Sequence, residues 1–213
     1  MKSIVVIFTM ILSACPMHAQ DKFTGAMLSN LEMSKNAATI SEFQELANNF
    51  ERIATAEQDE WTAWYYAAFY NLVINFQDSV NDRKMQYITM AEKQIEKGLK
   101  LKPEETELMV LQVMSYYAEM AVDPMKGMTL FGEANALLDK AKSMNPENPR
   151  IYLAQAEAVY AMPVEFGGGK DKALPLLLLA SEKFSNFVPA DQLAPNWGKE
   201  RCEKLLSDCR GNY

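Results

Sequence analysis

The chain has 213 residues, of which 49% are hydrophobic, and 28 acidic residues against 21 basic ones give it a formal net charge of −7. This length is enough for one domain with a substantial core. The acidic balance and the lack of a basic stretch exclude a surface built for nucleic acid or anionic lipid.

The chain begins MKSIVVIFTMILSACPMHAQ, which has the build of a secretory signal peptide. Lys2 precedes an apolar run that is too short to span a membrane, which takes ~20 residues. We therefore expect residues 1–19 to be a leader, with cleavage near Ala19 releasing a periplasmic protein. Alternatively, residues 12–15 (LSAC) resemble the lipobox of bacterial lipoproteins, and cleavage before Cys15 would leave a lipid-anchored protein.

The only histidine is His18, within the expected leader. The mature chain would therefore lack histidine, which excludes Ser-His-Asp and Cys-His nucleophile pairs and the usual imidazole-bearing zinc sites. We expect no enzyme activity, no cofactor and no metal site. An enzyme that uses carboxylates alone, such as Glu157 or Glu165, is the remaining catalytic alternative.

The rest of the chain reads as helices, because apolar residues recur at three- and four-residue spacing between short polar or proline breaks. No stretch shows the alternation of a strand. The expected helices cover residues 23–34, 38–56, 60–77, 82–100, 104–122, 127–144, 149–162, 170–185 and 195–209.

A small–large–small pattern repeats along these helices. It is formed by Ala91-Ile95-Gly98, Ala134-Leu138-Ala141 and Ala173-Leu177-Ala180, with a fainter copy at Ala47-Phe50-Ala54. The small residues allow a neighbouring helix to approach, and the large residue fills the crossing. In two copies a proline follows, Pro103 and Pro146, and prevents the helix from continuing. A period of roughly 40 residues indicates an array of helix pairs.

These motifs resemble the tetratricopeptide (TPR) repeat, although the repeats here are longer than the usual ~34 residues. The resemblance implies an all-α fold: a right-handed superhelical array of antiparallel helix pairs, a TPR-like α-solenoid. We expect a leader (1–19) and a single domain (20–213) with repeats at 23–58, 59–102, 103–146 and 147–189 and a capping helix at 195–209. The two ends of the chain also resemble those of secreted Bacteroidetes repeat proteins.

In the TPR family, one side of each first helix lines a concave groove. Carried over position by position, this implies six groove residues: Tyr65, Phe69, Met114, Tyr117, Glu157 and Tyr160. The alternative is that they fill the core between helices, since aromatic stripes are more often core than site.

Three further features have simple structural explanations. Gly167–Gly169 followed by Lys170 looks like a phosphate loop, but Val164 and Asp171 stand where such a loop needs glycine and Ser/Thr, so we interpret it as a joint between helices. Cys202 and Cys209 are too far apart along one helix to form a disulfide. We expect most of the methionines of the middle of the chain to fill the helical core: Met85, Met90, Met109, Met114, Met120, Met125 and Met128.

The sequence thus predicts a non-catalytic, exported scaffold that presents its groove to a protein or peptide partner in the cell envelope, with no nucleic-acid partner. The alternative is a small-ligand carrier or transporter accessory, resembling the T-component lipoproteins of TRAP transporters. The sequence leaves the partner and the oligomeric state open.

Overall fold

The computed structural model describes residues 16–211, and within that range it contains helices and no strands. The expected Cys15 and most of the expected leader lie outside the described residues. The α-helices are α1 (Pro16–Ser34), α2 (Ile40–Ala56), α3 (Trp61–Gln77), α4 (Asn81–Leu101), α5 (Thr106–Val122), α6 (Gly127–Met144), α7 (Pro149–Ala161), α8 (Lys170–Asn186) and α9 (Lys199–Cys209). Short 3-10 helices, η1 (Pro124–Lys126) and η2 (Val164–Phe166), lie within two of the connections.

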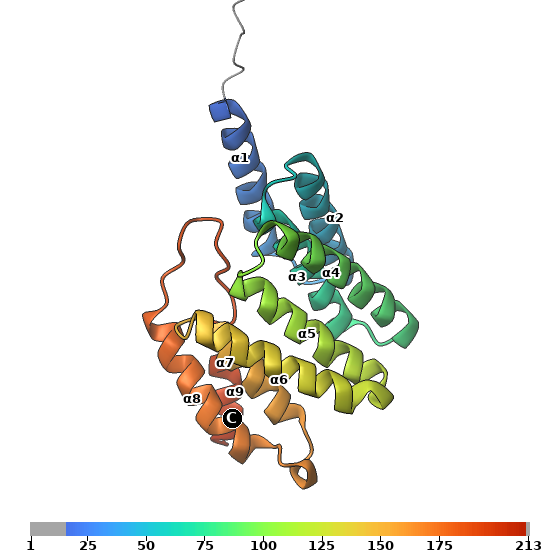
Figure 1. Cartoon of the computed structure of the whole chain (residues 1–213), viewed down its shortest axis with the longest axis vertical. Coiled ribbons are helices and arrows are strands. Elements are labelled where there is room, and N and C mark those ends of the chain that lie inside the picture. The colour runs from blue at the N-terminus through green and yellow to red at the C-terminus, as the bar shows by residue number, and fades with distance from the viewer. Residues whose placement is uncertain (1–15, 212–213) are drawn as a thin grey trace, which may run out of the picture.

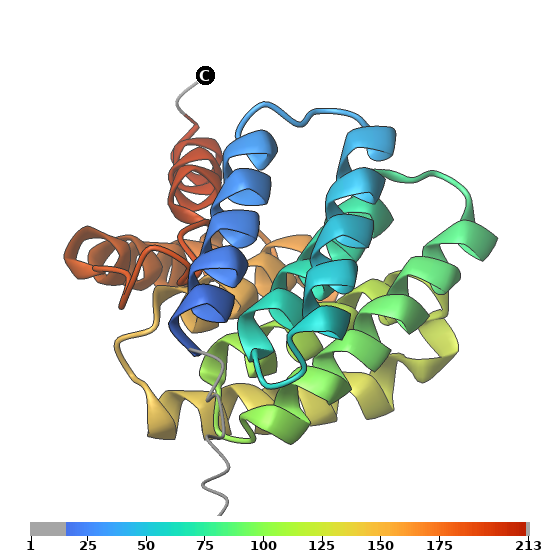
Figure 2. The same cartoon turned by 90° about the horizontal axis from the view of Figure 1, so that it is seen from above.

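Consecutive helices pack against each other as antiparallel neighbours, and α5 also packs against α3 on one side and α7 on the other. In Figure 1 the order descends from α1 and α2 at the top to α7, α8 and α9 at the bottom, and Figure 2 looks down on the α1–α2 end. The all-helical prediction is confirmed for the described residues. The right-handed superhelical order of a TPR solenoid stays a prediction.

The small–large–small pattern lies in the core, as the sequence predicts. Every member of the four copies is buried, and each member other than Gly98 has at most 1% of its surface exposed. Gly98 shows why a small residue is needed, since a Cβ there would lie 2.9 Å from both terminal methyl groups of Leu108 on the neighbouring helix. At Gly98 the small residue of the pattern therefore allows close packing of α4 against α5.

The glycine joint agrees with its interpretation. Gly167 (φ 86°) and Gly169 (φ 96°) have left-handed backbone angles. A Cβ on Gly168 would lie 2.2 Å from the carbonyl oxygen of Met162. Lys170 is bound to the Asp208 carboxylate at 2.7 Å. These residues turn the chain between α7 and α8, and the lysine fastens α8 to α9.

Helix bounds agree with expectation to within two residues except at the two ends. Helix α1 begins at Pro16 instead of residue 23, and α9 begins at Lys199 instead of residue 195. At α9 the cause is local: Gly198, at the N-cap, has φ 103° and is enclosed by Phe184 and Leu153. Residues 187–198 therefore form an extended connection, here called the closing segment.

The core prediction for methionine is wrong at two positions. Met109 is buried, but Met125 and Met128 are each 93% exposed at the α5–α6 connection. Met125 lies in η1 after Pro124, where helical periodicity does not apply, and Met128 lies in the first turn of α6, where its side chain is exposed. Cys202 and Cys209 are both free, as expected.

Candidate functional site

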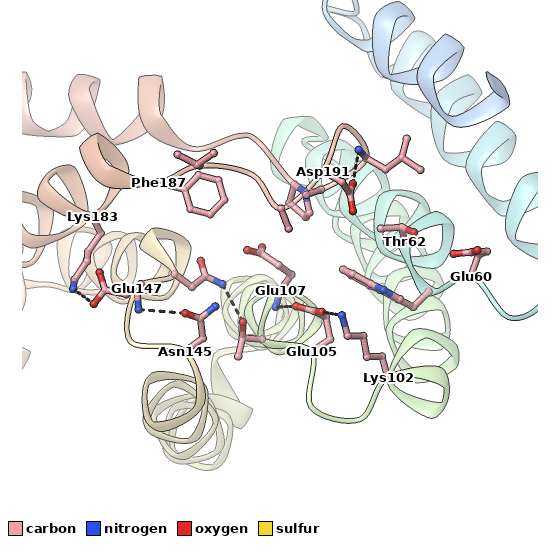
Figure 3. A pocket seen from close by; sticks show the side chains of 18 of the residues that line it. Glu60, Thr62, Lys102, Glu105, Glu107, Asn145, Glu147, Lys183, Phe187 and Asp191 are labelled. Carbon is pink, nitrogen blue, oxygen red and sulfur yellow. Dashed lines mark hydrogen bonds and ion pairs between the residues drawn. The ribbon is translucent and has the colours of Figure 1, made fainter. Parts of the chain in front are cut away.

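The candidate functional site is a pocket of about 630 Å³ at one edge of the helical stack. The turns that join successive helix pairs meet there: α2–α3, α4–α5 and α6–α7. Phe23 of α1 and the closing segment complete the wall. Figure 3 shows Lys102 and Lys183 on opposite sides of this pocket, with Glu107 between them.

Polar groups gather here because each of these turns ends one helix and caps the next within a few residues. Glu105 caps α5 by accepting a hydrogen bond from the backbone N–H of Glu107 at 3.2 Å. Asn148 caps α7 in the same way, accepting from the N–H of Arg150 at 3.0 Å. The Asn148 amide also donates to the Thr106 hydroxyl at 3.3 Å, which ties the two turns together.

Beneath the turns lies a buried ion pair between α5 and α7. Arg150 is fully buried, and its Nη1 donates to Oε1 of Glu107 at 3.1 Å. Its Nη2 donates to the carbonyl oxygen of Pro195 in the closing segment. The guanidinium carbon also lies 4.6 Å from the ring centre of Phe187 and 5.4 Å from that of Trp197. Arg150 thus joins α5, α7 and the closing segment.

Two atoms of this pair remain without a hydrogen-bond partner: Oε2 of Glu107 and Nε of Arg150. Burial raises the pKa of Glu107 to about 7, while the Arg150 guanidinium acts in the opposite direction. A carboxyl group that faces a pocket and titrates near neutral pH is a common feature of functional sites.

The closing segment is fastened to α3 by side-chain contacts. Trp197 Nε1 donates to the hydroxyl of Tyr65 at 2.6 Å, and its ring lies 4.9 Å, centre to centre, from Phe69. The Tyr66 hydroxyl donates to the carbonyl oxygen of Leu193 at 3.0 Å. Trp197 packs against all three hydrophobic clusters of the protein. It therefore joins the N-terminal and C-terminal halves of the stack.

The six predicted groove residues lie beside the chain's own C-terminal region or in the adjoining core. Tyr65 is fully buried and, with Phe69, meets Trp197. Glu157 pairs with Arg201 of α9 at 2.7 Å, and Tyr160 donates to Asp208 of the same helix. Their role as a partner groove stays a prediction.

The remaining two groove residues, Met114 and Tyr117, are partly buried against the hydrophobic core. None of the six lines the pocket. The groove interpretation and the pocket therefore concern different surfaces.

Sequence reasoning missed the pocket residues. Glu107 lies in the first turn of α5, where the helix dipole favours an acidic residue, so its presence there needs no site to explain it. A stronger signal was available in its spacing, because Glu107 stands four residues before Leu111 on a face that is buried. A charged residue on an apolar helix face requires a buried partner, but the sequence did not identify Arg150, 43 residues later, as that partner.

The candidates for carboxylate catalysis do not converge. Glu157 is paired with Arg201, and Glu165 is exposed in the α7–α8 connection. Across residues 16–211 we find no cluster of three or more His, Cys, Asp or Glu side chains suited to a metal ion. In the same range no helix is both long and apolar enough to cross a membrane.

The fold and the site together define an all-helical protein with a pocket at one edge, an arrangement consistent with a binding role. The comparison with solved structures supports this class: the chain is similar to the HusA haemophore from Porphyromonas gingivalis, a binding protein, with a TM-score of 0.71 and 29% identity. The match covers 94% of this chain and 95% of that one. No protein-family model matches the chain, and no curated protein matches it.

Proposed function

We propose that this protein is a non-catalytic carrier that binds a small, anionic, apolar-bodied ligand in the pocket at the turn edge. The observation that carries the proposal is the closing segment. It contacts Tyr65 of α3 and Arg150 of α7, and it forms part of the wall of a pocket of about 630 Å³. Ligand pockets typically measure ~300–1,000 Å³ and combine apolar walls with a few polar groups.

A tetrapyrrole is the first candidate, because the similar solved structure is that of a haemophore. Trp61, Phe187 and Phe23 supply apolar surface for a flat ring system. Lys102 and Lys183 stand on opposite sides of the pocket, where they can meet carboxylates of the ligand (Figure 3). Both lysines now pair with glutamates, Lys102 with Glu105 and Lys183 with Glu147, each at 2.6 Å.

The lining residues suggest how such a ligand would be held. Among the side chains that the structure describes, the lining includes no His, Tyr, Met or Cys, which usually ligate haem iron. Affinity would then come from ring contacts and carboxylate contacts, so haemin and metal-free protoporphyrin should bind with similar strength.

Titration of the protein with haemin and with protoporphyrin, followed by tryptophan quenching, tests this proposal. We expect saturable one-to-one binding of both, weakened several-fold by Lys102→Ala and by Lys183→Ala. Lys100→Ala is the matched control, because Lys100 is exposed on the same helix as Lys102 and pairs only with Glu96. No saturable binding of either compound would refute the tetrapyrrole assignment.

The contacts of α5 with α3 and with α7 favour a second candidate function, in which the helix pairs form a TPR-like frame for an envelope protein or peptide. Since α9 covers Glu157 and Tyr160, this function requires α9 to move. Tyr117→Ala should then weaken capture of the partner from envelope extracts while the variant keeps the helical circular dichroism spectrum of the native protein. Unchanged capture would show that the surface around Tyr117 does not bind the partner.

We also propose that the protein is exported through its leader. Mass spectrometry of the mature N-terminus would distinguish release after Ala19 from lipid attachment at Cys15, and an uncleaved N-terminus would contradict both.

A further inference from the structure

The floor of the pocket holds an unusual carboxyl group. Only 10% of the Glu107 side chain is exposed, and Arg150 occupies one of its two oxygens. The other oxygen, Oε2, has no hydrogen-bond partner although Glu107 lines the pocket. A buried carboxylate oxygen without a partner costs free energy as long as the group stays charged.

The groups around Glu107 come from every element packed against it. Arg150 from α7 is the adjacent cation. Glu105 from the α4–α5 turn adds a like charge, whereas Asn148 and Tyr65 favour the charged form. At the rim, Lys102 is paired with Glu105, and Asp191 of the closing segment caps its own turn by accepting from the Leu193 N–H. Burial exceeds the effect of Arg150, and the pKa of Glu107 lies at about 7.

A ligand in this pocket would change that balance. Its apolar body would displace water from the pocket beside Glu107, whose Oε2 is already shielded from solvent, and its negative charge would repel the carboxylate. Both effects favour the protonated form. The complex would then hold more protons than the free protein, so by linkage the affinity must rise as the pH falls.

We propose that Glu107 takes up a proton from solvent on Oε2 when an anionic, apolar-bodied ligand fills the pocket, so that binding strengthens between pH 8 and pH 6. This inference rests on the proposed carrier function of the pocket, but it does not require the ligand to be a tetrapyrrole.

The test uses two probes, haemin and 8-anilinonaphthalene-1-sulfonate, whose sulfonate stays charged throughout this pH range. Calorimetry of the full chain at pH 7.5 in phosphate and in Tris gives the number of protons bound with each probe. We expect uptake of about half a proton or more, and affinity about three- to tenfold tighter at pH 6 than at pH 8. Glu107→Gln should abolish both effects.

Glu60→Gln is the matched control, because it removes one carboxyl charge from the wall of the same pocket without touching the buried pair. It should keep the proton uptake. Infrared difference spectra of the native protein add a readout that needs no variant: ligand addition at pH 7.5 should produce the band of a protonated carboxyl group.

The outcomes separate the two proposals. Proton-linked binding of the sulfonate probe without haemin binding would refute the tetrapyrrole and keep the inference. The inference is overturned if neither probe binds, if Glu107→Gln retains the native pH dependence, or if the infrared band is absent.

Discussion

The two edges of the helical stack are built in opposite ways. The turn edge consists of the connections between helix pairs (57–60, 102–105 and 145–148) together with the closing segment. The loop edge consists of the connections within pairs (78–80, 123–126 and 162–169), on the opposite side of the stack in Figure 1. The turn edge buries Thr106, Glu107, Asn148 and Arg150, and the loop edge buries Asp78. Large exposed apolar side chains lie mainly at the loop edge (Phe76, Val80, Met125, Met128, Val164 and Phe166), although Val188 of the closing segment is 81% exposed.

The edges also differ in the range of their contacts. Loop-edge bonds are local: Arg83 holds Asp78, five residues away, and Lys126 holds Glu119, seven away. Turn-edge bonds join residues 43, 127 and 132 positions apart: Glu107 with Arg150, Tyr66 with Leu193, and Tyr65 with Trp197. Buried polar groups and exposed apolar patches are both informative about sites. The turn edge is the edge at which we propose a ligand pocket, because its buried polar contacts join distant parts of the chain.

Removing Arg150 should cause the largest loss in the free energy of unfolding. Arg150→Met leaves the Glu107 carboxylate and the Pro195 carbonyl oxygen buried without their donor, and we expect a loss of about 3–5 kcal/mol in the free energy of unfolding. Urea denaturation measures it. The pair Glu107→Leu with Arg150→Met should recover much of the loss. Arg83→Ala at the loop edge should cost far less, and equal losses at the two edges would contradict the comparison.

Trp197→Ala should cost about 3 kcal/mol, because the indole contacts all three hydrophobic clusters. The closing segment should also become sensitive to limited proteolysis, with new cleavage between residues 187 and 198. Trp197→Phe separates packing from hydrogen bonding: it keeps the ring but loses the bond to Tyr65, at a cost of about 1 kcal/mol. A native proteolysis pattern in Trp197→Ala would show that other contacts hold the segment.

Gly198→Ala should cost about 1–3 kcal/mol, since the residue has φ 103° and its Cβ would lie 2.8 Å from Cζ of Phe184. Gly132→Ala provides the contrast, because Gly132 lies within α6 and a Cβ there meets nothing within 4 Å. That change should stabilise the protein by about 0.5–1 kcal/mol. Thermal unfolding of both variants measures the difference, and the same sign for both would argue against strain at Gly198.

Met125→Ser at the loop edge should have the smallest effect, within about 0.5 kcal/mol, because the side chain is 93% exposed. Leu138→Ala, buried in the following helix, should instead cost about 2–5 kcal/mol. Chemical denaturation of the two variants compares them directly. A large loss in Met125→Ser would mean that the loop edge packs against something within the folded protein.

The sequence by itself determined the local structure of this protein. Helical periodicity, the prolines that follow α4 and α6 and the glycine joint depend on residues a few positions apart, so most helix bounds followed from them. The buried copies of the small–large–small pattern followed for the same reason. The sequence also limited the chemistry, since a chain whose only histidine lies in its expected leader has few catalytic options.

Only the tertiary structure decided where the site lies. No periodicity relates Glu107 to Arg150 or Trp197 to Tyr65, because such contacts depend on how whole helices stack and where the last segment returns. Tyr65 illustrates the difference. Its place on a helix face was predictable, but its full burial depends on a tryptophan 132 residues later in the chain. Helical periodicity determines which face of a helix a side chain occupies, and the tertiary packing of helices and loops determines what that face contacts.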